Sequence, residues 1–281
     1  IVELLVQIAM ARILAPDQFG ALAIMLVFVN VGNVIVQSGM NTALVQKTGI
    51  DSVDCSTVFW MSFAISLVMY VLIFAFAPAI SEFYSIPYLV WPLRALCLIL
   101  IINSFNSIQI ALIQRALEFR KVFNATLISI FISGSAGIAL AVAGAGLWSL
   151  VAQQLMYQVA NCIVLAFQVR WFPKMEFSRM RARSLFSFGW KLLVSGLLNQ
   201  GYQSLSDLII GRQFSAVSLG FVSQGKKYPQ AIGSLLNGAI QPVMLSTVAH
   251  VQNDIGYVKR LVRRALKTST YLIVPCMALF A

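Results

Sequence analysis

Long uncharged stretches of apolar residues divide this sequence into segments of similar length. A helix needs roughly 20 apolar residues to cross a membrane, and residues 55–81 and 95–114, for example, carry no charged side chain. The uncharged stretch 122–169 is too long for one crossing, and the glycines at positions 144 and 146 favour a tight turn that divides it. The pattern predicts nine membrane helices, at residues 1–14, 20–38, 56–77, 92–114, 122–143, 147–169, 190–211, 222–247 and 268–281.

Several of these segments carry polar side chains at intervals of three or four residues, which places them on one helix face. An amide without a partner costs several kcal/mol in hydrocarbon, so such a face is expected to contact other helices or a wet cavity. We predict a central polar lumen, lined by Asn30, Asn33, Gln37, Asn41, Gln200, Gln203, Gln230, Asn237 and Gln241. The alternative is that these amides only bond helices to one another. A similar series runs along 147–169 from Gln154, and small residues such as Ser133 indicate close packing of 122–143.

The sequence repeats itself at an offset of 200 residues. Arg12 and Gly20 are eight residues apart, and so are Arg212 and Gly220. An even number of predicted helices separates the paired ones, so both halves have the same orientation in the membrane, an arrangement found in secondary transporters. We therefore predict an all-α integral membrane protein, with two parallel-repeat lobes of transmembrane helices around a central lumen and the second lobe truncated.

The repeat also predicts the domain organisation. Residues 1–169 form an N-terminal lobe of six transmembrane helices, 170–189 a basic cytoplasmic linker, and 190–281 a partial C-terminal lobe with the remaining three. The first and last helices are expected to be truncated, because the chain begins at Ile1 instead of a methionine and the final apolar stretch stops abruptly.

The composition excludes several classes of protein. Apolar residues make up 59% of the chain and charged residues 10%, with a mean hydropathy of +0.85, whereas soluble domains are about 45–50% apolar and about 25% charged. A soluble enzyme, a disordered tail and a secreted disulfide scaffold therefore fit poorly. The four cysteines are far apart and lie mostly in apolar stretches, which is typical of buried structural residues.

The chain has 20 Lys and Arg residues against 9 Asp and Glu residues, a net charge of +11. Most of the cations lie in alternate loops, such as 115–121, 170–191 and 259–267, which the positive-inside rule assigns to the cytoplasm together with the N-terminus. The excess is therefore a topology signal, and we expect no nucleic-acid partner. The five remaining cations lie on the other side of the membrane: Arg12, Arg94, Arg212, Lys226 and Lys227.

The five outer cations favour an anionic, phosphate-bearing substrate, although Arg12 and Arg94 could instead extend to the membrane interface. Two carboxylates, Glu3 and Asp207, lie at membrane depth, where a charge is costly and a functional role is the default expectation. We predict that they couple transport to an ion. The sequence has no catalytic triad, zinc-ligand spacing or nucleotide-binding loop. We therefore expect no catalytic residues, no metal site, no enzymatic activity and no cofactor other than a coupling H⁺ or Na⁺.

Six segments, in order along the chain, resemble the polysaccharide transporter family. They are ARILAPDQFG at 11–20, SGMNTALVQ at 38–46, ALIQRALEFRK at 111–121, FGW at 188–190, DLIIGR at 207–212 and LG at 219–220. This family contains bacterial lipid-linked oligosaccharide flippases of the multidrug/oligosaccharidyl-lipid/polysaccharide (MOP) exporter superfamily. The segments are most similar to its colanic acid and lipopolysaccharide exporter branch.

The resemblance implies a two-lobed helical bundle that works by alternating access. The implied substrate is an oligosaccharide repeat unit on undecaprenyl pyrophosphate, flipped across the bacterial inner membrane for O-antigen, capsule or exopolysaccharide biosynthesis. Lumen cations would engage the pyrophosphate, and a proton or sodium gradient would drive the cycle. Positions that match the family pattern are Arg12, Gly20, Asp207, Arg212, Gly220 and Lys227, whereas Val222 and Lys226 depart from it. Expected partners are the lipid-linked substrate, membrane lipid and the polysaccharide polymerase machinery.

Three alternatives remain open. A cation-coupled multidrug antiporter of the same superfamily would be expected to have acidic rather than basic lumen residues. A membrane-embedded glycan-assembly enzyme usually needs a large loop with acids or histidine, whereas residues 170–189 are basic with one acid, Glu176. A membrane scaffold has no need for polar faces on paired helices.

Overall fold

The structure is a computed structural model, and it describes residues 2–37, 39–46, 50–116, 118–227 and the single positions 263, 267, 270 and 271. The chain forms two compact units, Ile1–Phe221 and Val222–Ala281. The fold reported below is that of the first unit. The predicted lumen residues Gln230, Asn237 and Gln241 lie outside the described residues, as do most of the predicted helices 222–247 and 268–281.

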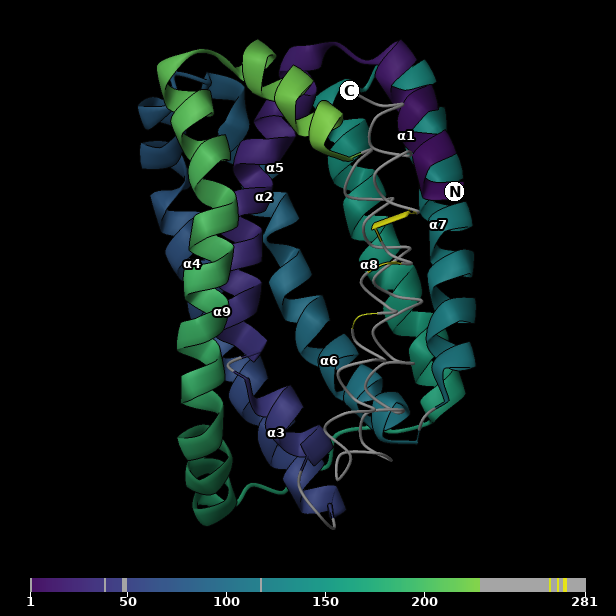
Figure 1. The fold of residues 1–281 in the computed structure, drawn as a ribbon, viewed down its shortest axis with the longest axis vertical. Coiled ribbons are helices and arrows are strands. Elements are labelled where there is room, and N and C mark those ends of the chain that lie inside the picture. Colours follow the sequence, from purple (N-terminus) through teal and green to yellow (C-terminus); the bar gives the residue numbers. More distant parts are fainter. Residues whose placement is uncertain are drawn as a thin grey trace. The chain divides into compact units, whose positions relative to one another are not determined.

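The first unit is built from helices, and no strand occurs among the residues that the structure describes. The prediction of an all-α protein is therefore confirmed. The helices are α1 (Val2–Ile13), α2 (Pro16–Gln37), α3 (Met40–Gln46), α4 (Ser52–Phe83), the 3-10 turn η1 (Pro87–Leu89), α5 (Val90–Leu96), α6 (Leu98–Ala116), α7 (Phe119–Val142), α8 (Leu147–Val169) and α9 (Arg179–Gln213) (Figure 1).

Five helical stretches within the described residues are long and apolar enough to cross a membrane. They are Pro16–Val45, Ser52–Phe83, Pro87–Ala116, Phe119–Val142 and Leu147–Val169. These coincide with the five helices predicted between residues 20 and 169, which supports a multi-pass membrane protein. The turn between α7 and α8 also lies where the sequence predicts it, because Gly144 (φ 81°) and Gly146 (φ 55°) adopt the left-handed conformation that favours glycine.

Helix α9 differs most from its prediction, because it begins at Arg179 and not near residue 190. The hydroxyl of Ser178 caps it by accepting a hydrogen bond from the backbone N–H of Arg181 at 3.5 Å. The charges that end the apolar span do not end the helix, since Arg, Met, Ala and Leu are good helix formers. Only 170–178 is non-helical between α8 and α9. The 35 residues of α9 span roughly 50 Å, more than the apolar thickness of a bilayer.

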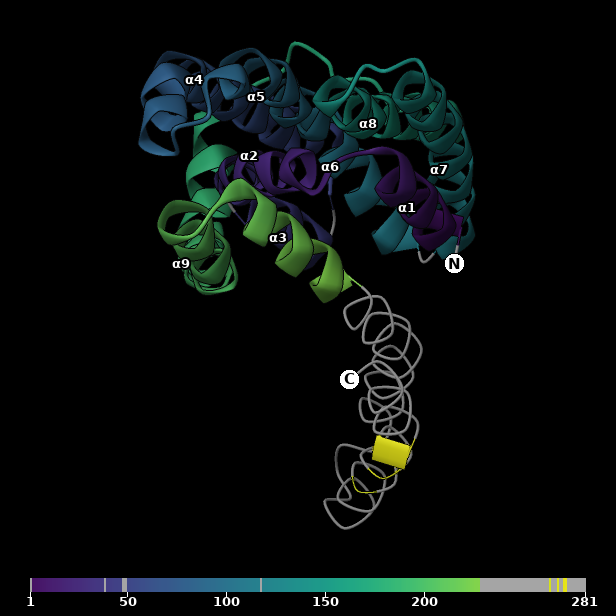
Figure 2. The ribbon, with the colours of Figure 1, turned by 90° about the horizontal axis from the view of Figure 1, so that it is seen from above.

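Helix α2 lies at the centre of the unit, in contact with α4, α6, α8 and α9 (Figure 2). Its Ile24 and Met25 are fully buried in the main hydrophobic core. The outer helices instead expose large apolar side chains, among them Val68 and Phe76 of α4. An outer surface this rich in apolar side chains is suited to lipid.

The start of α2 crosses the helical residues 216–220 at very close range. A Cβ atom built on Gly20 would lie 1.8 Å from the carbonyl oxygen of Ala216, and one built on Gly220 would lie 1.9 Å from that of Pro16. Small residues allow helix backbones to approach in this way. The contact is reciprocal at the offset of 200 seen in the sequence, as expected where two equivalent helices meet about a twofold axis.

The connection 170–178 packs against the first turns of α4 through hydrogen bonds. The indole Nε1 of Trp60 donates to the carbonyl oxygen of Lys174 at 2.9 Å. In return, the backbone N–H groups of Lys174 and Ser178 donate to the hydroxyls of Ser56 (3.2 Å) and Thr57 (3.3 Å). The connection therefore follows the end of α4 instead of extending away from it.

Arg181 in the first turn of α9 adds an ion pair to this contact. Its Nη1 lies 3.1 Å from Oδ2 of Asp51 and 3.1 Å from Oδ1 of Asp54. These two acids form a capping box at the start of α4, where the helix dipole favours negative charge. Their hydrogen bonds raise the pKa of Arg181 above its ordinary value. The two carboxylates differ in burial, since the side chain of Asp54 is 1% exposed and that of Asp51 is 69% exposed.

Basic side chains gather at one end of this unit. The long helices alternate in direction, so the α6–α7 and α8–α9 junctions lie at the same end as the start of α4 (Figure 1). We call it the basic end, because among the described residues it carries Arg115, Arg120, Lys121, Arg170, Lys174, Arg179, Arg181 and Arg183. Arg12, Arg94 and Arg212 lie near helix termini at the opposite end, as the loop pattern predicts. Which end faces the cytoplasm stays a prediction, as do the two lobes and their boundaries.

Candidate functional site

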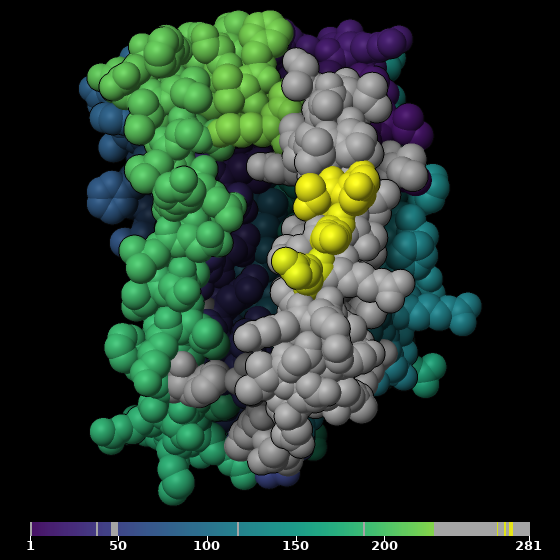
Figure 3. Space-filling model, in the orientation of Figure 1, coloured from purple at the N-terminus to yellow at the C-terminus, as the bar shows by residue number. Residues whose placement is uncertain are grey.

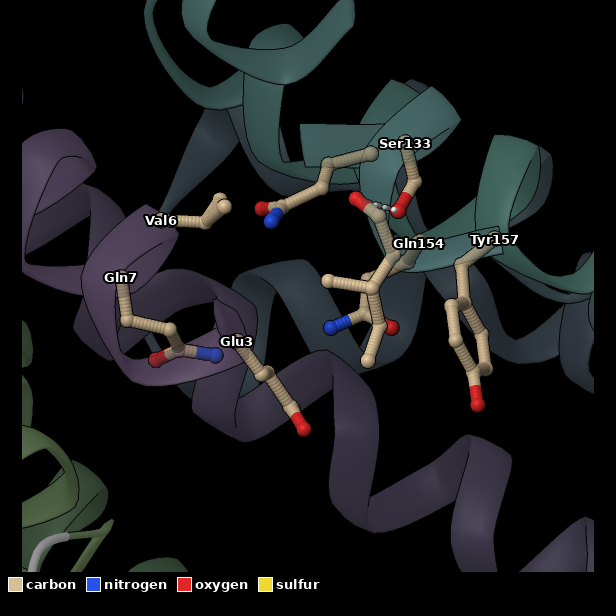
Figure 4. Close-up of a pocket in the computed structure, with 8 residues that line it drawn as sticks. Glu3, Val6, Gln7, Ser133, Gln154 and Tyr157 are labelled. Atoms are coloured by element: carbon tan, nitrogen blue, oxygen red, sulfur yellow. Dashed lines mark hydrogen bonds between the residues drawn. The ribbon is translucent and has the colours of Figure 1, made fainter. Parts of the chain in front are cut away.

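A small polar cavity lies between α1, α7 and α8. It has a volume of about 140 Å³ and is lined by Glu3, Val6, Gln7, Ile130, Ser133, Gln153, Gln154 and Tyr157. Figure 4 shows Glu3 and Gln7 projecting from α1, with Ser133, Gln154 and Tyr157 on the neighbouring helices. Because Ile130 and Ser133 lie near the middle of α7, the cavity is far from both ends of this apolar helix.

The charged group of the cavity is the carboxylate of Glu3, an exposed residue near the start of α1. Around it are the side-chain amides of Gln7, Gln153 and Gln154 and the phenol of Tyr157, and the hydroxyl of Ser133 donates to the carbonyl oxygen of Ile130 at 3.4 Å. A carboxylate at membrane depth can take up a proton, and amide and hydroxyl oxygens beside it can bind a cation. The arrangement therefore suits a site that exchanges H⁺ or Na⁺.

The sequence indicates only part of this cavity. Glu3 stands out because charge is rare in an apolar helix, and Gln154 and Ser133 belong to series noted in the sequence. Gln153 and Tyr157 were missed, although Tyr157 follows Gln153 by four residues and so shares its helix face. Asp207, the second carboxylate predicted to couple an ion, does not line this cavity; it is half-buried near the end of α9.

The predicted lumen residues on α2 and α3 do not share one environment. The side-chain Nδ2 of Asn103 on α6 donates to Oδ1 of Asn33 at 2.9 Å, which is a bond between helices. Asn30 and Gln37 are exposed in the described part of the chain. The side-chain oxygen of Asn41 is buried and has no hydrogen-bond partner there.

On α9 the predicted lumen amides bond along their own helix. Nε2 of Gln200 donates to the hydroxyl of Ser204 at 2.9 Å, and Nε2 of Gln203 donates to Oδ1 of Asn199 at 3.3 Å. Gln203 remains exposed. One predicted lumen amide therefore joins helices and others are exposed, and that they line a lumen stays a prediction.

Two of the predicted outer cations lie over aromatic rings of α4. The guanidinium of Arg94 lies 4.0 Å from the centroid of the Phe74 ring and 5.2 Å from that of Trp91, and its Nε donates to the carbonyl oxygen of Phe74 at 3.3 Å. The guanidinium of Arg212 lies 4.8 Å from the centroid of Phe83. Such cation–π contacts fix a guanidinium without neutralising it.

The other three outer cations are placed differently. Arg12 at the end of α1 is exposed. Lys226 and Lys227 belong to the second unit and are half-buried, and both have interaction partners. The structure therefore brings Arg94 and Arg212 to one helix, and their aromatic partners were not identified from the sequence. No group of three His, Cys, Asp or Glu residues suited to a metal occurs within the described residues.

Comparison with known proteins gives one family and several distant relatives. A family model described as "Polysaccharide biosynthesis protein" matches residues 9–281. The succinoglycan biosynthesis transport protein ExoT of Rhizobium meliloti is 25% identical over 268 residues, covering 95% of this chain and 54% of that protein. The lipopolysaccharide biosynthesis protein WzxC of Escherichia coli is 24% identical over 251 residues, covering 87% and 50%.

A third relative matches a shorter part of this chain. The teichuronic acid biosynthesis protein TuaB of Bacillus subtilis is 25% identical over 189 residues, covering 66% of this chain and 39% of that protein. The chain spans about half the length of the first two curated relatives. No solved structure matches the chain significantly.

Proposed function

The chain belongs to the polysaccharide biosynthesis protein family, and from this premise we propose that it is part of a flippase for lipid-linked oligosaccharides. The whole protein would carry undecaprenyl-pyrophosphate-linked repeat units across the bacterial inner membrane by alternating access, for assembly of a surface polysaccharide. The observation that carries the proposal is the family match over residues 9–281 of a multi-pass helical protein. Relatives named for transport and for polysaccharide biosynthesis support it.

The opposite end of the first unit supports an anionic substrate. An arginine has five N–H donors, so a guanidinium stacked on a ring keeps donors for phosphate oxygens. Arg94 of α5 and Arg212 of α9 are fixed on rings of α4 in this way, and we propose that they contact the pyrophosphate together with Arg12. For Lys226 and Lys227 we propose the same role from the loop pattern of the sequence. The exposed amides of α2 and α9 would meet the sugar hydroxyls.

The basic end supports an orientation. The positive-inside rule places it in the cytoplasm. Helix α1 begins on the side to which α2 returns, so the N-terminus would be cytoplasmic too. Transport of this kind needs no chemical step by the protein, and we propose no enzymatic role. The polymerase machinery that consumes the flipped repeat unit is the proposed partner.

Complementation with the full-length gene tests this function. In strains that lack a repeat-unit flippase, the gene should restore a surface polysaccharide in at least one background. Arg12→Gln, Arg212→Gln and Lys227→Gln should each lower export at unchanged protein level. Arg120→Gln, an exposed cation at the basic end, is the matched control and should export normally. Failure in every strain would contradict the flippase, and normal export by all three variants would contradict the role in pyrophosphate binding.

The cavity around Glu3 supports a site for the driving ion. We propose that Glu3 exchanges H⁺ or Na⁺ during the cycle, because it is a carboxylate with polar neighbours at membrane depth. Asp207 on α9 is the second candidate coupling group. A drug antiporter of the same superfamily would use similar carboxylates, but its cationic substrates do not suit the arginines held on α4.

A further inference from the structure

The segment 170–187 combines cations with exposed apolar side chains. Phe172, Met175, Phe177 and Met180 are 71%, 93%, 54% and 83% exposed. Interleaved with them are five cations and one acid: Arg170, Lys174, Arg179, Arg181, Arg183 and Glu176. Basic segments with large apolar side chains are typical of protein that lies in the membrane interface.

The position of this segment agrees with that interpretation. It follows the last residue of α8 and is hydrogen-bonded along the first turns of α4. It therefore lies at the level where apolar helix α8 ends and apolar helix α4 begins. Figure 3 shows the first turns of α9 projecting at this end, with side chains extending from the surface. Exposed phenylalanine and methionine side chains at this depth would insert among lipid headgroups and the adjoining acyl chains.

A shallow groove lies on the first turns of α9. It has a volume of about 540 Å³ and is lined by Arg179, Met180, Arg183, Ser184 and Ser187. Positions 179, 183 and 187 are four residues apart and share one helix face. Two guanidiniums and two hydroxyls donate to phosphate oxygens, and Met180 offers an apolar wall for the start of an acyl chain.

The charge in this groove is not neutralised by the protein. Arg181, between the two groove arginines, is bound to Asp51 and Asp54. Within the described residues, neither Arg179 nor Arg183 forms an ion pair. Arg181 therefore fixes the start of α9 by its ion pairs, whereas the charges of Arg179 and Arg183 are available to an anion outside the protein.

We propose that this groove binds the phosphate headgroup of an anionic phospholipid from the leaflet at the basic end. The groove supplies charge complementarity, the flanking apolar side chains place it at headgroup depth, and anionic lipids are abundant on the cytoplasmic leaflet. The site goes beyond the proposed transport function, because it anchors the start of α9 to the bilayer whatever the protein carries.

Lipid titration of the purified full-length protein tests the site. Phosphatidylglycerol or phosphatidylcholine is added to the protein in detergent, and bound lipid is counted by native mass spectrometry. Arg179→Gln/Arg183→Gln should weaken phosphatidylglycerol binding about tenfold or more and leave phosphatidylcholine binding unchanged. Arg179→Lys/Arg183→Lys should retain most of the binding. The control Arg120→Gln/Lys191→Gln removes two exposed cations outside the groove and should bind like the wild type.

Three results would overturn the assignment. Equal loss in the control pair would mean that diffuse charge, not the groove, binds the lipid. Equal binding of the two phospholipids by the wild type would mean that headgroup charge is irrelevant. Displacement of phosphatidylglycerol by a much lower concentration of undecaprenyl pyrophosphate would make the groove a substrate site instead. A melting temperature equal to that of the wild type would show that the glutamine variant is folded.

Discussion

Glu3 is a carboxylate at an exposed position of α1, beside the polar cavity between α1, α7 and α8. The amides and hydroxyls that line the same cavity are neighbours that can donate hydrogen bonds to this carboxylate. A residue of this kind is detectable in a sequence because it breaks an apolar pattern. Tyr157, which lines the same cavity, is not detectable in this way, since its role depends on how α1 and α8 each pack beside α7.

Replacing Glu3 with glutamine tests the coupling site. Glu3→Gln in the full-length protein keeps the size and polarity of the side chain but removes the group that binds H⁺ or Na⁺. We expect gradient-driven export to be lost while protein level and substrate binding stay normal. Glu176→Gln, which removes an exposed acid in the connection, is the control and should export normally. Wild-type export by Glu3→Gln would remove this residue from any role in coupling.

The paired acids at the start of α4 give a second test. Asp51 and Asp54 lie at the same distance from Arg181, but only Asp54 is buried. Asp54→Asn leaves a buried amide facing the guanidinium, whereas Asp51→Asn changes a solvated contact of little net value. We therefore expect Asp54→Asn to lower the melting temperature clearly and Asp51→Asn to change it little. Equal shifts in thermal unfolding would contradict this account of the contact.

The arginines at the opposite end show where residue-level prediction stops. The alternation of loop charge predicts that Arg94 and Arg212 lie at the end opposite the basic end, where the structure has them. The rings beneath them, Phe74 and Phe83, are apolar residues like many others in α4 and carry no separate signal. Their role arises because α5 and α9 both pack against α4, which a linear pattern does not encode.

The helix crossing at Gly20 and Gly220 is the clearest link between the repeat and the structure. The offset of 200 residues is enough to identify the two glycines as equivalent positions. It does not indicate that they touch, since equivalent helices in a repeat can be far apart. The reciprocal approach to Ala216 and Pro16 supplies that information.

Alanine substitution at this crossing gives a prediction at the scale of the element. The added methyl group would meet a backbone carbonyl that cannot rotate away, so the helices must separate. Gly20→Ala and Gly220→Ala should each destabilise the protein by about 1–3 kcal/mol. Gly201→Ala in α9 meets nothing within 4 Å and should be neutral or stabilising, because alanine is the better helix former. Melting temperatures of the three variants check this, and equal tolerance of all three would contradict the close approach.

The ends of helices were predicted with uneven success for a physical reason. The α7–α8 turn was found because two glycines adopt a backbone conformation that other residues avoid. The start of α9 was missed because the sequence pattern follows hydrophobicity, and a helix can continue into water when capping and propensity allow it. Here Ser178 and the Asp54–Arg181 ion pair fix a start that hydropathy does not mark.

At the scale of the whole molecule, the sequence predicts helices that can cross a membrane, but not which of them are neighbours. Apolar length identifies the five helical stretches between residues 16 and 169 that are long and apolar enough to cross, and alternating loop charge predicts the separation of cations between the two ends. The central place of α2, and the meeting of α1, α7 and α8 around a polar cavity, depend on contacts between distant parts of the chain.

The most direct test of the central claim is a flipping measurement on the full-length protein in sealed proteoliposomes. An undecaprenyl-pyrophosphate-linked oligosaccharide is placed in both leaflets, and its accessibility to an impermeant sugar-modifying enzyme is followed over time. We predict that the protein makes the inner-leaflet pool accessible when a proton or sodium gradient is imposed, and that Glu3→Gln does not. A pool that stays protected with wild-type protein, or wild-type vesicles that move cationic drugs instead, would contradict the account.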